Sequence, residues 1–201
     1  MLANGVSAYF RTGSFAAGAE LIDAIAELAE AANHHPDVDL RYSGVTVRLV
    51  THEVGGLSIR DAELARQISQ AARELDIRAD PTAVQEVDLA IDALVTPQVM
   101  PFWRAVLDYK QVGDEDLEDR RGRGPSIWFQ KMDAARPQRN RIHVDVWVPH
   151  DSAEARVEAA IAAGGRLVTA EHAPAWWTLT DAEGNEVDVA TWMGRDRPPS
   201  A

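Results

Sequence analysis

The sequence contains no cysteine, which excludes disulfide bonds and zinc sites with thiolate ligands. It also contains no hydrophobic run as long as a membrane span. Its first residues, MLANGVSAYFRTGSF, have no basic segment followed by an apolar core, so no signal peptide is expected. These absences together indicate a cytoplasmic protein with no membrane partner.

Positive charge is scarce as well. Twenty lysine and arginine residues face 32 aspartate and glutamate residues, which gives a net charge of -12. Nucleic-acid phosphates and anionic membrane surfaces both require basic residues, so neither is expected as a partner. The hydrophobic content of 46% and the charged content of 26% are ordinary for a globular protein. A chain of 201 residues has room for one large domain or two small ones.

A break between two domains is expected at residues 76–84, DIRADPTAV, because this stretch carries a proline and little apolar periodicity. We therefore predict domains at residues 1–78 and 85–195, with an α+β fold. In the first domain Pro36 disfavours helical geometry at His35, so the first helix must end before it. The expected elements are a strand at 7–12, a helix from Ser14 to about Ala32, a hairpin of strands 39–42 and 45–52, and a helix starting at Ser58.

The second domain contains a faint internal duplication. Residues 87–112 and 142–168 share one plan, in which a strand, a loop and a helix lead through a small-residue turn into another strand. Further strands are expected at residues 126–132, 175–181 and 185–192. Two βαβββ modules of this kind would enclose a shared sheet-lined cleft.

Three of the six histidines lie in one stretch, NHHPDVDLRYSGVTVRLVTHEVGGLSIRD. His34 and His35 occupy an extended corner and His52 ends a strand, so the three can converge in one compact unit. Histidine exchanges protons near neutral pH, which suits acid–base catalysis. Purely structural roles remain open, including a polar helix end and a simple capping box in SIRD. A zinc site is less favoured, because adjacent residues of an extended segment point to opposite sides.

This stretch resembles the pterin-4a-carbinolamine dehydratases, also called 4a-hydroxytetrahydrobiopterin dehydratases. The resemblance covers about residues 6–76 and implies an antiparallel sheet with helices on one face. Family members carry an N-terminal helix and a tryptophan-bearing strand before the position of Ala8, where this sequence has residues 1–7, so the sheet is expected to be shortened or completed by another segment. Val38 stands where the family has an aromatic residue. The residues at the family's spacing are Glu30, His34, His35, Pro36, Tyr42, Thr51, His52, Glu53, Gly56, Leu57, Arg60 and Asp61.

The resemblance implies a hydro-lyase that removes water from a 4a-hydroxytetrahydropterin and yields quinonoid dihydropterin, with no metal required. It implies a pterin as the small-molecule partner and a homo-oligomeric assembly. Of the catalytic set His34, His35, His52 and Asp61, we expect His34 and His52 to be the acid–base pair and His35 to position the pterin. Glu30 and Asp61 are expected to orient the imidazoles. The expected substrate-binding residues are Glu30, Pro36, Tyr42, Thr51, Glu53 and Arg60. A non-catalytic pterin-binding, small-molecule-binding or dimerisation protein is the alternative.

The second domain resembles the glyoxalase-like branch of the vicinal oxygen chelate superfamily over about residues 87–193. The resemblance is carried by Phe102-Trp103, RIHVDVWV, AAGGRLV and LTDAEGNEVDVATW. It implies a possible divalent metal held by Asp88, Gln130, His143 and Glu186, one residue from each of four equivalent strands, and a metal-dependent lyase or dioxygenase is a further alternative function. The alternative is that His143 holds no metal and only lines a cavity together with Asp145 and Trp147. We expect either an apolar pocket or the core to contain Trp128, Trp147, Trp176 and Trp177.

Overall fold

The computed structural model describes residues 5–80, 82–135 and 142–195. The chain divides into two compact units, Met1–Glu86 and Val87–Ala201, and each is described by itself. Within the described residues, none of the helices combines the length and the apolar character that crossing a membrane requires.

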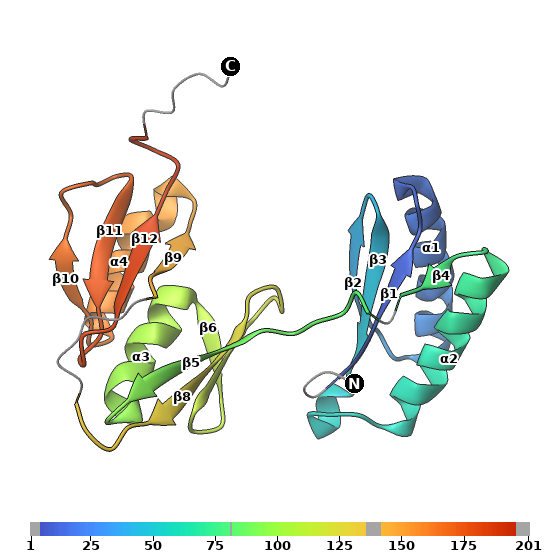
Figure 1. The fold of residues 1–201 in the computed structure, drawn as a ribbon, viewed down its shortest axis with the longest axis horizontal. Coiled ribbons are helices and arrows are strands. Elements are labelled where there is room, and N and C mark those ends of the chain that lie inside the picture. The colour runs from blue at the N-terminus through green and yellow to red at the C-terminus, as the bar shows by residue number, and fades with distance from the viewer. Residues whose placement is uncertain (1–4, 81, 136–141, 196–201) are drawn as a thin grey trace. The chain divides into compact units, whose positions relative to one another are not determined.

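The first unit is a four-stranded antiparallel sheet with two helices on one face (Figure 1). The strands lie in the order β2-β3-β1-β4, which places β1 and β3 in the middle. This arrangement is the predicted α+β fold of the first domain. Its elements are β1 (Val6–Arg11), α1 (Phe15–Ala32), β2 (Asp37–Arg41), β3 (Gly44–Leu49), the 3-10 helix η1 (His52–Val54), α2 (Ile59–Glu74) and β4 (Arg78–Ala79).

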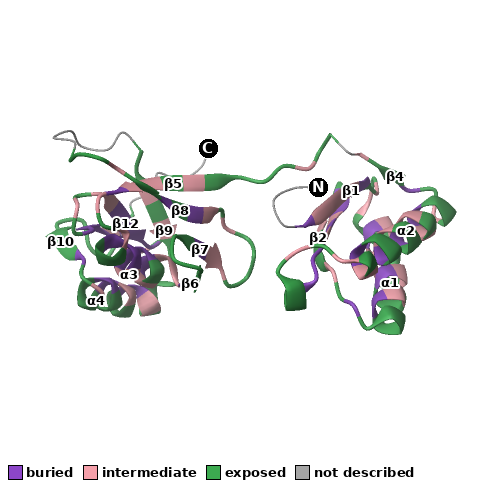
Figure 2. Ribbon diagram, turned by 90° about the horizontal axis from the view of Figure 1, so that it is seen from below, coloured by how far each residue is buried: buried purple, intermediate pink, exposed green. Residues whose placement is uncertain are grey.

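Both helices form because an apolar stripe at helical spacing follows a good N-cap residue. Ser14 accepts a hydrogen bond from the backbone N–H of Ala17 at 3.1 Å, and Ser58 caps α2. Figure 2 shows the buried stripe along each helix and the exposed residues beside it. The predicted starts of both helices are confirmed. The stripes consist of Leu21, Ile25 and Ala29 in α1 and Leu64, Ile68 and Ala72 in α2. All of these except Ala29 share one core cluster with Val45, Val47 and Leu49 of β3.

A short strand after α2 completes the sheet beside β1. Phe10 and Arg11 of β1 pair with Ala79 and Arg78 of β4. The guanidinium of Arg11 donates to the carboxylate of Asp80, with its Nε atom at 2.9 Å. The edge of β1 that faces away from β3 is therefore covered by a segment that follows the second helix in the chain.

The second unit repeats one βαβββ plan twice, as predicted. In each module the first strand pairs in parallel with the last, and the remaining strands follow in antiparallel order. The first module contains β5 (Asp88–Ala93), α3 (Thr96–Leu107), β6 (Tyr109–Val112), β7 (Asp116–Asp119) and β8 (Ser126–Lys131). The second contains β9 (Val144–Trp147), the 3-10 helix η2 (His150–Ser152), α4 (Ala153–Ala162), β10 (Arg166–Thr169), β11 (Trp176–Thr180) and β12 (Glu186–Ala190).

The loop between β11 and β12 joins the two modules. The buried carboxylate of Asp181 accepts the indole N–H of Trp103 at 2.9 Å and also closes its own loop through Asn185. Glu183 accepts the backbone N–H groups of Leu94 and Val95, just before α3, at 2.7 and 2.8 Å. The DAEGNE part of the sequence motif therefore has a structural role, since it fixes the start of α3 against the other module.

The tryptophans of this unit lie either in its core or on the sheet faces that point away from the core. Trp103 and Trp177 lie in the core that both modules share. Trp128 and Trp147 are 40% and 55% exposed and belong to the opposite face. Of the four tryptophans with an expected use, Trp177 lies in the core, and the apolar pocket stays a prediction.

Candidate functional site

The end of α1 turns His34 into the first unit. Asn33 adopts a left-handed conformation with φ 45° and ψ 44°. The N–H groups of Asn33 and His34 then bond the carbonyls of Glu30 and Ala29, both at 3.1 Å. This is a Schellman helix end, and asparagine tolerates its left-handed residue better than most side chains. The turn leaves His34 only 6% exposed.

Asp61 receives the His34 ring. Its Oδ1 atom lies 2.8 Å from His34 Nε2, and its side chain is 1% exposed. Its Oδ2 atom accepts the Thr51 hydroxyl at 2.6 Å and the Ser58 N–H at 2.7 Å. Asp61 is the third residue of α2 and completes the Ser58 capping box. The carboxylate that starts α2 is therefore the same one that holds the histidine.

The hydrogen bonds around Asp61 determine its charge. Burial is the largest single influence and raises its pKa, but donation by the Thr51 hydroxyl, the Ser58 N–H, His34 and the Ser58 hydroxyl together holds the pKa well below the usual range. Asp61 is thus ionised at neutral pH and can only accept. It follows that Nε2 of His34 carries a proton in the folded protein.

The other ring nitrogen of His34 faces solvent. Among the described residues, no fully enclosed side-chain nitrogen or oxygen lacks a hydrogen-bond partner. In that part of the chain the Nδ1 atom of His34 has no partner, so it must hold part of the accessible surface of the ring. A ring with Nε2–H fixed on a carboxylate and Nδ1 accessible is arranged to exchange protons through Nδ1.

His52 and His35 are both exposed, unlike His34. His52 begins η1 directly after Thr51, whose backbone closes the loop by pairing with Gly56. His52 is therefore the next residue in the chain after Thr51, whose hydroxyl donates to Asp61. The ring of His35 is 56% exposed and lies 3.1 Å from a carboxylate oxygen of Glu30.

The remaining candidate residues separate into two places. We call residues 33–36, which include His34 and His35, the histidine corner. Arg60 donates to the carbonyl of Asn33 at 2.5 Å and lies 3.7 Å from Glu53, so Arg60 and Glu53 both border this corner. Pro36 follows His35 in that corner. Tyr42 is 74% exposed in the turn between β2 and β3, at the opposite end of that hairpin. Within one chain the structure does not bring Tyr42 to the histidines.

A groove of about 890 Å³ lies elsewhere in the first unit. Its lining comes from α1 and α2 and includes Leu28, Arg66 and Gln70, but none of the candidate site residues. The histidine corner is therefore a separate surface from this groove.

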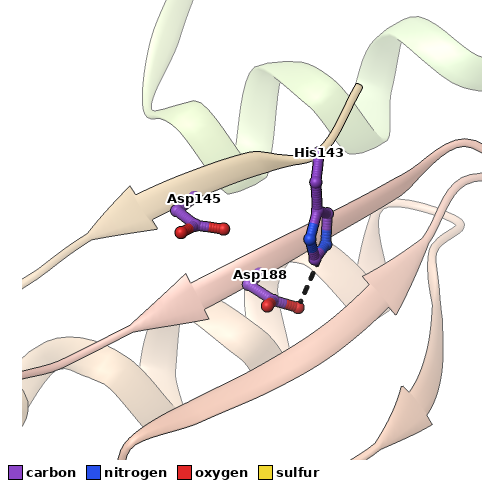
Figure 3. A group of neighbouring side chains, drawn as sticks. All are labelled: His143, Asp145 and Asp188. Carbon is purple, nitrogen blue, oxygen red and sulfur yellow. Dashed lines mark ion pairs between the residues drawn. The ribbon is translucent and has the colours of Figure 1, made fainter. Parts of the chain in front are cut away.

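The second unit brings together one imidazole and two carboxylates. His143 precedes β9, Asp145 lies on β9 and Asp188 on the neighbouring strand β12 (Figure 3). One ligand atom of each lies within 4.8 Å of the others, and His143 Nε2 is 3.4 Å from Asp188 Oδ1. The Thr178 hydroxyl donates to the same oxygen at 2.6 Å.

This group differs from the ligand set expected from sequence. Asp88 pairs with Ser126, whereas Gln130 pairs with Asp92, so the two lie four residues apart along parallel strands. At about 3.3 Å per residue this offset is about 13 Å, too far for one ion. Glu186 is not a member of the group, and of the expected set only His143 is.

Sequence reasoning missed Asp188 as a partner of His143 and the hydrogen bond from the Thr51 hydroxyl to Asp61. The alternation in HVDVW did place Asp145 on the face of His143. Asp188 joins them only through the pairing of β9 with β12, more than forty residues apart. Thr51 was expected to contact substrate, but its hydroxyl is turned to Asp61 instead.

The sequence signatures of two families match the chain. The family described as "Pterin 4 alpha carbinolamine dehydratase" matches residues 2–71, and the "Glyoxalase-like domain" family matches residues 88–190, just over half of the chain. A Nocardia farcinica protein named "Putative pterin-4-alpha-carbinolamine dehydratase" is 50% identical over 68 residues, which cover 34% of this chain and 72% of the relative. A Chloroflexus aggregans protein of the same name is 43% identical over 67 residues, covering 33% and 71%.

Two solved structures are similar to separate parts of the chain. A transcriptional coactivator/pterin dehydratase from Brucella melitensis is 28% identical, covers 34% of this chain and 73% of its own, and has a TM-score of 0.34. A glyoxalase/bleomycin resistance protein/dioxygenase family enzyme from Burkholderia phytofirmans is 17% identical, covers 52% and 98%, and has a TM-score of 0.43.

The fold and the two sites define a class of two-unit proteins. In this class a dehydratase-like α+β unit is followed by paired βαβββ modules. The chain belongs to the pterin-4a-carbinolamine dehydratase family in its first unit and to the glyoxalase-like domain family in its second.

Proposed function

We propose that the first unit dehydrates a 4a-hydroxytetrahydropterin to the quinonoid dihydropterin by histidine acid–base catalysis. The observation that carries this proposal is the buried pair of His34 and Asp61 at 2.8 Å, in which Asp61 also accepts the hydroxyl of Thr51, the residue directly before His52. The family membership of this unit supports the same chemistry.

The reaction requires one proton donor and one proton acceptor. The bond from carbon 4a to its hydroxyl oxygen breaks, and the oxygen leaves as water with a proton from the acid. A ring nitrogen releases its proton to the base, and its electron pair forms the new carbon–nitrogen double bond. No electrons enter or leave, so the protein has to supply only correctly placed acid–base groups.

His34 is the better candidate for the base. When Nδ1 accepts the proton, the ring becomes an imidazolium whose charge faces the ionised carboxylate of Asp61. His52 then protonates the departing hydroxyl from the exposed loop. Asp61 acts through His34 and is a positioning residue, and Thr51 in turn positions Asp61.

The pterin is expected to bind in the exposed corner beside these groups. His35 with Glu30, and Arg60 with Glu53, present ring and guanidinium surfaces there. Pro36 fixes the extended backbone of the corner. We leave Tyr42 out of the site of a single chain, because it lies at the far end of the hairpin.

Turnover of freshly generated 4a-hydroxytetrahydropterin tests the proposal. The wild-type chain is expected to accelerate dehydration above the spontaneous rate, and His52→Ala to lower that acceleration by about 10²–10⁴-fold with the fold intact. His52 is exposed, so its loss should not unfold the unit. Saturable pterin binding with a spontaneous rate of dehydration would favour a non-catalytic binding protein instead.

We also propose that His143, Asp145 and Asp188 hold a divalent cation in the glyoxalase-like unit. Ligand atoms at about 2.0–2.2 Å from one ion lie up to about 4.4 Å apart, so atoms within 4.8 Å need only a small shift. One imidazole with two carboxylates suits a borderline ion such as Mn²⁺ or Zn²⁺. Bound there, such an ion would polarise an oxygen atom of a ligand.

Metal analysis after dialysis against Mn²⁺ and Zn²⁺ tests this site. We expect about one ion per chain for the wild type and for Asp88→Ala, and a large loss for His143→Ala. His143 is 43% exposed, so the substitution should leave the fold unchanged. An equal loss in Asp88→Ala would favour the ligand set expected from sequence, and retention by His143→Ala would exclude this histidine as a ligand.

A further inference from the structure

Three neighbouring strands of the glyoxalase-like unit place two tryptophans in one row. Ala190 of β12 pairs with Trp176 of β11 on one side and with Trp147 of β9 on the other. Residues paired in this way share a sheet face, and neighbouring strands are about 4.8 Å apart. The backbone positions of the two tryptophans are therefore about 10 Å apart, with only the methyl side chain of Ala190 between them. We call this row the tryptophan clamp.

The clamp already contains a cation from the same chain. The guanidinium carbon of Arg195 lies 4.2 Å from the centre of the Trp147 ring and 5.5 Å from that of Trp176. Its nitrogens donate to the carbonyls of Thr191 at 2.9 Å and Ala175 at 3.3 Å. In the described part of the chain no carboxylate forms an ion pair with Arg195, so aromatic faces and carbonyls alone accommodate its charge.

The surroundings of the clamp favour positive charge. The next row on the same face consists of Asp145, Asp188 and Thr178, each two residues away from the clamp residue on its own strand. When no metal ion is bound to Asp145 and Asp188, this row adds negative potential near a pair of indole faces, which themselves attract cations. His172 stacks on Trp176 at 4.2 Å and helps to fix that ring. An anionic ligand would face the carboxylates, whereas a planar organic cation would be attracted by both rows.

We propose that the tryptophan clamp is a binding site for ligands that carry a guanidinium group, and that Arg195 is an internal occupant which such a ligand displaces. Arg195 follows β12 by only five residues and lies on an exposed segment, so it can leave the clamp without disturbing the sheet. The site is separate from the histidine corner, and the proposal does not depend on dehydratase activity.

Internal competition gives the proposal a quantitative consequence. A ligand binds only the fraction of molecules in which the clamp is free, so its apparent affinity falls by that fraction. If Arg195 fills the clamp about nine-tenths of the time, its removal raises the affinity about tenfold. Loss of either indole must weaken binding, because a cation between two rings loses one of its faces.

Calorimetric titration with butylguanidinium tests the site, with its neutral isostere butylurea as the matched ligand and EDTA present to remove metal ions. We expect the full chain with Arg195→Ala to bind butylguanidinium about tenfold more tightly than the wild type, and neither chain to bind butylurea. Adding Trp147→Ala to the Arg195→Ala chain should weaken binding about tenfold or more. Trp147 is 55% exposed, so this change should not unfold the protein.

Trp128 provides the control variant. It is 40% exposed and pairs with Ala90, but its other neighbour is Asp116 rather than a second tryptophan. Trp128→Ala in the Arg195→Ala chain should leave butylguanidinium binding unchanged. Equal affinities of wild type and Arg195→Ala, no binding by Arg195→Ala, equal binding of butylurea, or equal effects of the Trp128 and Trp147 substitutions would each overturn the proposal.

Discussion

Replacing Asp61 with alanine is expected to destabilise the first unit by about 3–5 kcal/mol, because it breaks a buried charged network by removing one partner. His34 Nε2, the Thr51 hydroxyl and the Ser58 N–H would all lose their acceptor at once. Denaturant unfolding of the first unit measures the effect. Asp39→Ala is the matched control, since the Asp39 side chain is 54% exposed and, within the described part of the chain, forms its ion pair with Arg41, two positions along the strand. That control is expected to change stability by about 0.5 kcal/mol or less.

The same carboxylate predicts how stability depends on pH. The pKa of Asp61 in the folded protein lies below its ordinary value of 3.8, so the unfolded chain takes up the proton first as pH falls. The stabilisation is therefore complete above about pH 5 and is lost as pH decreases through the ordinary pKa towards the lowered one. Asp61→Asn should flatten this part of the profile. An unchanged acid dependence in Asp61→Asn would show that other groups cause it.

The second large effect concerns His34. His34→Ala is expected to lower kcat for dehydration by about 10²–10⁴-fold, because it removes the group that we propose exchanges a proton in the transition state. His35→Ala should mainly raise KM, because the His35 ring is half exposed and pairs with Glu30 at the surface. Steady-state kinetics of both variants separates the two roles.

The burial of His34 requires a further control for that experiment. His34→Gln keeps a side chain that can donate to Asp61, so it is expected to fold like the wild type while remaining inactive. Activity retained by a folded His34→Gln chain would mean that His34 only supports the structure. The assignment of the base would then pass to another residue of the histidine corner.

Much of the fold could be predicted from local patterns. The apolar spacing of α1 and α2, the cap residues Ser14 and Ser58, and the alternation in β3 depend only on neighbouring residues. The duplication of the second unit was visible because each βαβββ module repeats one order of elements. β4 was not predicted, since two residues with no periodicity give no strand signal.

The sites were predicted less completely, because they depend on pairing between distant strands and on side-chain direction. The convergence of His34 and His52 was expected from their places in one compact unit, whereas Asp61 was added to them only through the resemblance to a family. It could not indicate that Thr51 turns inwards, because either face of a strand end accepts a threonine. The register of β9 against β12 pairs Asp188 with Asp145, and the ring of His143, two residues before Asp145, lies 3.4 Å from Asp188; one sequence does not contain that register.

Asp61 has two tasks, and this affects how related sequences should be interpreted. A descendant that had lost dehydration would still need Asp61, Ser58 and Thr51 to start α2 and close the loop after β3. Retention of these residues therefore reports selection for folding and does not identify an active enzyme. His52 is exposed, and no hydrogen bond or ion pair joins its side chain to another described residue. Natural variation at position 52 is thus the clearer record of whether catalysis has been kept.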